Sequence, residues 1–135
     1  MKHGFWRYIA LLLAAIALFA IVASACSGSS GASPPPKTNA DGSITYYLKA
    51  DNLKFDSNRM SFPAGVKVTI VFNNADSVQH NFALYRDSTV ASSIFRGEYV
   101  GKKTVNYTFT APAQPGTYYF QCDLHPEMNG TFVAS

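Results

Sequence analysis

The stretch GTYYFQCDLHPEM, residues 116–128, joins a strand pattern to three side chains that can bind metals. Its first half alternates, so Tyr118 and Cys122 are expected to share one face of a strand and to point toward a core. Its second half follows the spacing Cys-x-x-His-x-x-Met and supplies His125 and Met128. A lone cysteine is commonly a small buried hydrophobic residue, and a histidine beside a proline is commonly only a loop residue. The three together favour a metal site at the end of a strand.

The chain from Ser43 onward shows the period-two alternation that is typical of half-buried strands. Groups rich in proline, glycine and asparagine separate the alternating segments. Residues 88–101 lack clear alternation, which predicts a long crossover with a short helix or a loop. The pattern predicts an all-β domain over residues 43–135, an antiparallel Greek-key β-sandwich that can fold without a disulfide. The alternating segments are residues 44–49, 66–72, 104–109 and 117–122.

Residues 1–25 have the pattern of an export signal. Lys2 and Arg7 precede a run without charges that extends to Cys26, which matches the charged and apolar regions of a secretory signal peptide. The small residues before Cys26 resemble the lipobox of bacterial lipoproteins, in which the cysteine is acylated and becomes the mature N-terminus. The alternative is an uncleaved anchor, because a run of about 18 apolar residues can span a bilayer. Both interpretations tether the domain at the outer face of the bacterial cytoplasmic membrane.

The segment after this signal is a linker, and the charge of the remaining chain is nearly balanced. Residues 26–42 consist mainly of serine, glycine and proline, a composition typical of flexible or semi-extended linkers. Without residues 1–25 the chain keeps 9 of its 11 Lys+Arg against 8 Asp+Glu, so its net charge is 9 − 8 = +1. Its longest basic run is Lys102-Lys103, whereas nucleic-acid binding depends on clustered cations. We therefore expect no nucleic-acid partner.

The two cysteines suggest a disulfide in an exported protein, but a lipidated Cys26 leaves Cys122 without a partner. Metal ligation would keep such a thiol reduced. Of the three histidines one lies in the signal, so His80 is the candidate to join His125, although alone it would be an ordinary strand-edge residue. Two histidines, one thiolate and one methionine suit copper, whereas methionine is a poor zinc ligand and iron–sulfur clusters need more thiols. Met60 is expected to fill the core.

Four motifs together resemble those of the cupredoxins, the small blue copper proteins, and within them most closely those of amicyanin and the plastocyanins. The resemblance covers residues 43–135, and the short loop with a proline after the second histidine is similar to that of amicyanin. The motifs are Phe62-Pro63-x-Gly65, His80-Asn81, Gly116-Thr117-Tyr118-x-Phe120-x-Cys122 and Cys122-x-x-His125-Pro126-x-Met128.

This resemblance implies one type 1 copper site, coordinated by two histidines, a cysteine and a methionine. It also implies that Asn81 donates its backbone N–H to the thiolate and that its side chain ties the two ligand loops together, here to Asp123. Asp123 stands where the family usually has Ser or Thr, so its charge near the thiolate is expected to change the reduction potential. The implied copper ligands are His80, Cys122, His125 and Met128.

The function that the resemblance implies is outer-sphere transfer of single electrons between a donor and an acceptor protein that bind transiently to a monomer. In the family the second histidine emerges through an apolar patch where partners dock, which points to Leu124, His125 and Pro126, although these residues equally fit a role in shaping the loop. A copper module for storage or delivery is the alternative, against which stands the lack of Met-rich or His-rich tracts. An enzyme would need ligands for a second copper. A purely structural sandwich remains if His80 and Cys122 lie far apart.

Overall fold

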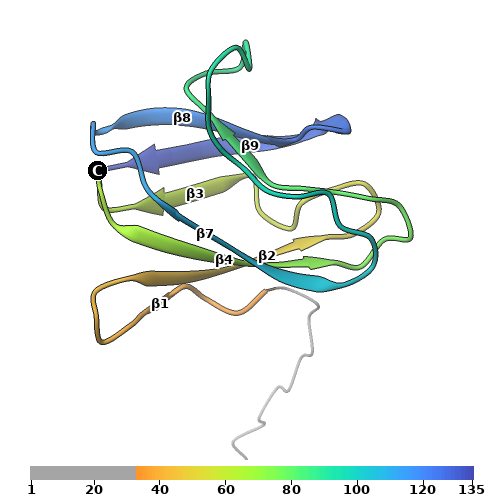
Figure 1. Ribbon diagram of the computed structural model, residues 1–135, viewed down its shortest axis with the longest axis horizontal. Helices are drawn as coiled ribbons and strands as arrows, with labels where there is room; N and C mark the ends of the chain where they lie inside the picture. The colour runs from red at the N-terminus through yellow and green to blue at the C-terminus, as the bar shows by residue number, and fades with distance from the viewer. Residues whose placement is uncertain (1–32) are drawn as a thin grey trace, which may run out of the picture. The chain divides into compact units, whose positions relative to one another are not determined.

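The computed structural model describes residues 33–135, which form two packed β-sheets (Figure 1). The expected signal of residues 1–25 and the expected lipidation at Cys26 lie outside the described residues. Within residues 33–135 no helix is long and apolar enough to cross a membrane. One sheet has the strand order β1 (Lys37–Thr38), β2 (Ile44–Ala50), β4 (Lys67–Asn74), β7 (Thr104–Thr110). The other has the order β3 (Arg59–Phe62), β9 (His125–Ala134), β8 (Gly116–Cys122), β5 (Ala83–Tyr85), β6 (Ser93–Arg96).

The all-β sandwich is confirmed, but its sheets are mixed and not wholly antiparallel as predicted. β2 runs parallel to β4, and β3 runs parallel to β9, whereas the other pairs are antiparallel. Parallel neighbours need a crossover connection, and the chain between β2 and β4 makes one by contributing β3 to the opposite sheet. Alternation shows which face of a strand is buried and carries no information on the direction of its neighbours.

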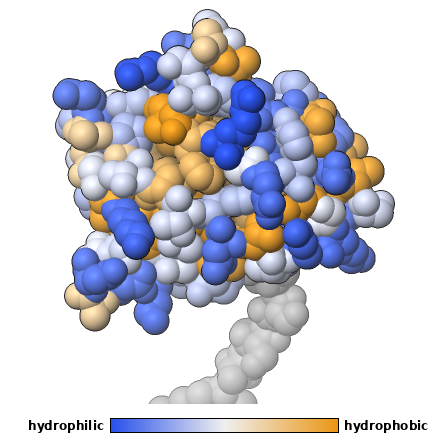
Figure 2. All heavy atoms as spheres, in the orientation of Figure 1, coloured by the Kyte–Doolittle hydropathy of each residue, from blue (hydrophilic) through white to orange (hydrophobic). Residues whose placement is uncertain are grey.

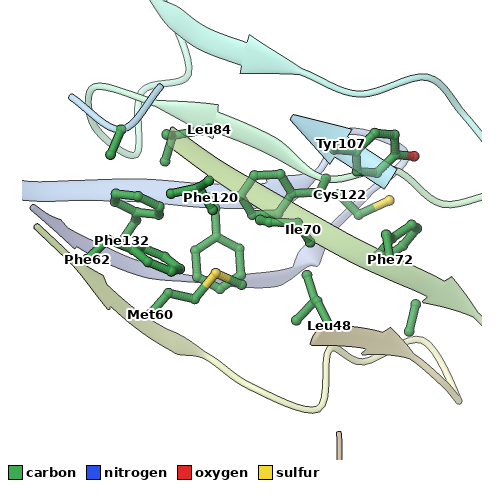
Figure 3. Packing of buried hydrophobic residues seen from close by; sticks show 14 of the residues in the cluster. Leu48, Met60, Phe62, Ile70, Phe72, Leu84, Tyr107, Phe120, Cys122 and Phe132 are labelled. Atoms are coloured by element: carbon green, nitrogen blue, oxygen red, sulfur yellow. The ribbon is translucent and has the colours of Figure 1, made fainter. Parts of the chain in front are cut away.

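The hydrophobic core lies between the two sheets and is rich in aromatic rings. Strand β4 illustrates its origin, because every second residue from Val68 to Asn74 is buried. Met60 is buried in this core, 1% exposed, as the sequence predicts. Figure 3 shows Cys122 at the same end of the cluster as Phe72 and Tyr107. The fully buried apolar side chains of the core include Leu48, Phe62, Ile70, Phe72, Phe82, Leu84, Phe120 and Phe132.

Two segments are more regular than the sequence indicated. Residues 88–101 hold no helix; they contain β6, a half-exposed edge strand that pairs with β5 through a register shift at Leu84 and Tyr85. That shift and the exposure on both faces explain why the segment shows no clear alternation. The expected linker also contains β1, in which Lys37 and Thr38 pair with the start of β2. The sheet that contains β2 therefore also includes Lys37 and Thr38.

One end of the sandwich gathers the segments that carry the candidate ligands. β8 ends at Cys122 and β9 begins at His125, and this hairpin lies at the opposite end of the sandwich from the C-terminus (Figure 1). The segment after β4 leads to His80, which forms an isolated bridge with Val100. Residues distant in sequence therefore meet beside a two-residue turn.

Candidate metal centre

The hairpin between β8 and β9 places the first two candidate ligands opposite each other. Cys122 is fully buried and is the registered partner of His125, because only Asp123 and Leu124 separate the two strands. A register shift between Gln121 and Cys122 accompanies this pairing. Met128 lies on β9 itself, and it is 2% exposed within the same hydrophobic cluster as Cys122.

His80 reaches the hairpin because the end of β4 anchors the segment that carries it. Asn74 is the last inward residue of β4, and its Nδ2 donates to the carbonyl oxygens of Val78 and Val100 at 2.8 Å each. His80 exchanges two backbone hydrogen bonds with Val100, of 3.0 and 2.9 Å. The imidazole is fully buried as a result. Asn74 was not identified from the sequence. It could have been found as a polar residue at a position where the alternation of β4 predicts a buried side chain.

The donor atoms of His80, Cys122 and His125 converge on one point. All three ligand atoms lie within 4.8 Å of one another. The Cys122 Sγ atom is 3.6 Å from the His80 Nδ1 atom and 3.7 Å from the His125 Nδ1 atom. With metal–nitrogen and metal–sulfur bonds of about 2.0 and 2.3 Å, as for zinc, two donors 120° apart would be separated by about 3.7 Å. The spacing therefore fits a single ion in a trigonal His2Cys arrangement.

The outer nitrogen of His80 is held by a carboxylate, which leaves the inner nitrogen for a metal. The His80 Nε2 atom lies 2.9 Å from the Asp76 Oδ2 atom, and such a bond fixes ring orientation and tautomer. Asp76 also accepts the backbone N–H groups of Asn52 and Leu53 at 2.8 and 3.1 Å. Burial opposes ionisation, but these N–H groups and the His80 ring together lower the pKa of Asp76. Asp76 was not identified from the sequence, since only the fold brings it back to the ring.

Asn81 and Asp123 link the two ligand segments, as the resemblance implied. The Asn81 Nδ2 atom donates to Asp123 Oδ2 at 3.0 Å, and the backbone N–H of Asp123 donates to Asn81 Oδ1 at 2.8 Å. Asn81 Nδ2 also donates to the Gly97 carbonyl oxygen at 3.1 Å. Asn81 is fully buried, so this reciprocal pair fixes the position of the hairpin turn relative to His80.

The expected docking residues form the outer side of the site. Leu124 is 47% exposed, Pro126 is exposed, and His125 is half-buried between them. His80, in contrast, is shielded on all sides. Of the two histidines, only His125 is therefore partly exposed to solvent.

Taken together, His80, Cys122, His125 and Met128 are arranged for a type 1 copper site. Two imidazoles and a thiolate in a trigonal set, with a methionine as the weak axial ligand, are diagnostic of blue copper electron-transfer centres. Within residues 33–135 the only free cysteine is Cys122, and it is buried. A binuclear thiolate-bridged centre would need a second thiol at this place.

Comparison with known proteins supports the same assignment. A family model described as a cupredoxin-like domain matches residues 11–134. Auracyanin-A from Chloroflexus aurantiacus is 31% identical over an alignment 156 positions long, gaps included, which covers 93% of this chain and 96% of that protein. The solved structure of auracyanin A from the same bacterium, described as a "blue" copper protein, superposes with a TM-score of 0.61 at 28% identity, covering 70% of this chain and all of that one. Amicyanin from Paracoccus versutus shares the fold, with a TM-score of 0.52 at 24% identity over 76% of this chain and 93% of that one.

Proposed function

The chain belongs to the cupredoxin-like family, and from this premise we propose that it binds one copper ion and carries single electrons between redox proteins. The observation that carries the proposal is the spacing of 3.6 and 3.7 Å between the Cys122 thiol and the Nδ1 atoms of two histidines. We further propose that the domain is tethered, by lipid on Cys26, at the outer face of a bacterial cytoplasmic membrane. The signal pattern of residues 1–25 supports that location.

The protein's contribution to electron transfer is a rigid set of donors. Bound copper supplies a one-electron Cu(I)/Cu(II) couple. His80 is held by Asp76 on one side and by its backbone bonds to Val100 on the other. Asn81 and Asp123 hold the cysteine-bearing hairpin in register with it. Donors fixed in this way move little between the two oxidation states, so little reorganisation opposes the transfer.

The partner surface is an apolar rim, which we define as Leu53, Val78, Tyr99 and Leu124. These side chains are 44%, 45%, 45% and 47% exposed and lie in four different loops at the ligand end. Two of them are held by residues that support His80: the Asp76 carboxylate accepts the backbone N–H of Leu53, and Asn74 donates to the backbone carbonyl oxygen of Val78. Figure 2 shows hydrophobic atoms scattered among polar ones over the visible face, which includes the side where these loops lie in Figure 1. Exposed apolar side chains among polar groups are typical of protein interaction sites, and a small interface suits brief encounters.

Replacing Leu124 by Ser should slow electron exchange between oxidised and reduced copies by about tenfold, because losing about 1.5 kcal/mol of apolar burial weakens an encounter complex by that factor. The reduction potential should stay unchanged. Self-exchange is measured by NMR line broadening in mixtures of the two oxidation states. Val90→Ser is the matched control, since Val90 is 37% exposed but lies in the β5–β6 turn. Equal slowing in both variants would contradict docking through the rim.

The proposed function is tested by adding one equivalent of Cu(II) to the metal-free full chain in detergent. We expect an intense visible thiolate-to-copper band, bleached by one electron per copper and restored on oxidation. The protein should retain its copper through repeated cycles in the presence of a Cu(I) chelator. Colourless binding, or loss of the ion to the chelator after the first reduction, would instead favour copper storage or delivery.

A further inference from the structure

The carboxylate of Asp123 has more partners than its role beside Asn81 requires. Its Oδ1 atom accepts the Tyr85 hydroxyl at 2.5 Å, and its Oδ2 atom lies 3.1 Å from the Arg96 Nε atom. Arg96 also donates from a terminal nitrogen to the Tyr85 hydroxyl oxygen at 2.8 Å. Asp123, Tyr85 and Arg96 come from the β8–β9 turn, β5 and β6. Each of the three contacts the other two, and Asp123 directly follows Cys122 in the chain.

The contacts among Asp123, Tyr85 and Arg96 balance the charge of the Asp123 carboxylate. The side chain of Asp123 is only 10% exposed, while that of Arg96 is 56% exposed. A carboxylate so shielded from water needs a cation or several donors to remain ionised at low cost. Burial and the hydrogen bond to Asp123 raise the pKa of Tyr85, so the phenol keeps its proton and acts as a donor. Arg96 is then the only cation that compensates Asp123 among the described residues.

We propose that Arg96 is a positioning and charge-balancing residue of the copper site, which cancels the charge of Asp123 beside the Cys122 thiolate and holds the hairpin turn through Asp123 and Tyr85. The proposal rests on the proposed function, since it concerns the electrostatic field at that site. It predicts that the reduction potential is set by the neutral Arg96–Asp123 pair and not by Asp123 alone. Arg96 forms no hydrogen bond or ion pair with a ligand, so it acts on the site through Asp123 and Tyr85.

The sign of each effect follows from which oxidation state the local charge favours. Arg96→Gln leaves an uncompensated carboxylate next to the thiolate, which stabilises the more positive, oxidised metal and lowers the reduction potential. Asp123→Asn leaves an uncompensated guanidinium and raises the potential. The double variant returns the pair to zero net charge, so its potential should move back toward the wild-type value. Arg96→Lys keeps the charge and should stay near the wild type, although it loses the forked contact to Asp123 and Tyr85.

The experiment measures the reduction potentials of these four variants in the copper-loaded full chain, with the visible band recorded for each. Arg86→Gln is the matched control, because Arg86 is exposed, follows Tyr85 on the side away from Cys122 and forms no ion pair within residues 33–135. Opposite shifts in the two single variants, cancellation in the double variant and no shift in the control would support the proposal. Shifts of the same sign, or none, would overturn it, since a purely structural role gives no sign reversal.

A second measurement keeps the inference separate from the proposed function. If the wild-type chain shows no thiolate-to-copper band, the proposed function fails and the potentials lose their meaning. The positioning role is then decided in the metal-free chain by thermal unfolding of the wild type, Arg96→Gln, Asp123→Asn and the double variant. If the double variant loses less free energy of unfolding than the two single variants lose in sum, the interaction between Arg96 and Asp123 is supported. Additive losses overturn it.

Discussion

Replacing Cys122 by Ser should abolish the intense visible band of the copper-loaded protein, while the metal-free fold should be retained. The band requires a thiolate, and a hydroxyl is neither deprotonated at neutral pH nor a soft donor for copper. The fold tolerates the change because Ser is close to Cys in size and its hydroxyl faces two imidazole nitrogens that can pair with it. The visible spectrum after one equivalent of Cu(II), with circular dichroism of the metal-free form, measures both results.

The other cysteine of the chain provides the control for this prediction. Cys26→Ser removes the proposed lipidation site but leaves every ligand of the copper site in place, so the band should keep its full intensity. The pair of variants thus separates the metal-binding thiol from the thiol proposed to carry lipid. A band that persists in Cys122→Ser, or disappears in Cys26→Ser, would mean that Cys122 is not the thiol that binds copper, which would contradict the prediction.

The sequence was sufficient to find the ligand set because most of it is local. Cys122, His125 and Met128 lie within seven residues, and His80 followed by elimination, since it is the one histidine outside the expected signal and the hairpin. The structure then brings the three nitrogen and sulfur donors together. The tie between Asn81 and Asp123 was also expected, because the family resemblance supplied it.

The groups that support the ligands could not be predicted in this way. Asp76 contacts His80 only because the segment between them turns back, and Tyr85 and Arg96 meet Asp123 only through the pairing of β5, β6 and β8. Strand alternation fixes which side chains face inward, but it does not say which strands are neighbours. The parallel pairs escaped prediction for the same reason, whereas the edge strand β6 did so because its partial exposure and the register shift of its pairing leave no clear alternation.

Replacing Gly130 by Ala should destabilise the domain by about 3 kcal/mol, the upper part of the usual range for overpacking a core. Gly130 is the registered partner of Phe120 across β8 and β9. A Cβ atom at this position would lie 2.4 Å from the Asn58 carbonyl oxygen and 2.5 Å from the Phe120 Cζ atom. Neither neighbour can easily yield, because the Asn58 oxygen accepts the Thr131 N–H at 2.9 Å and the Phe120 ring is fully buried.

Thermal unfolding of the metal-free chain measures this effect, and a loss of about 3 kcal/mol corresponds to a fall of about 15 °C in Tm for a domain of this size. Gly101→Ala is the control, because a Cβ atom there has no neighbour within 4 Å, and its stability should change by about 0.5 kcal/mol or less. The contrast tests the packing of the sandwich independently of copper. Equal stability of the two variants would mean that the segment at Asn58 does not approach β9, and that β3 is not docked beside the strand that carries His125 and Met128.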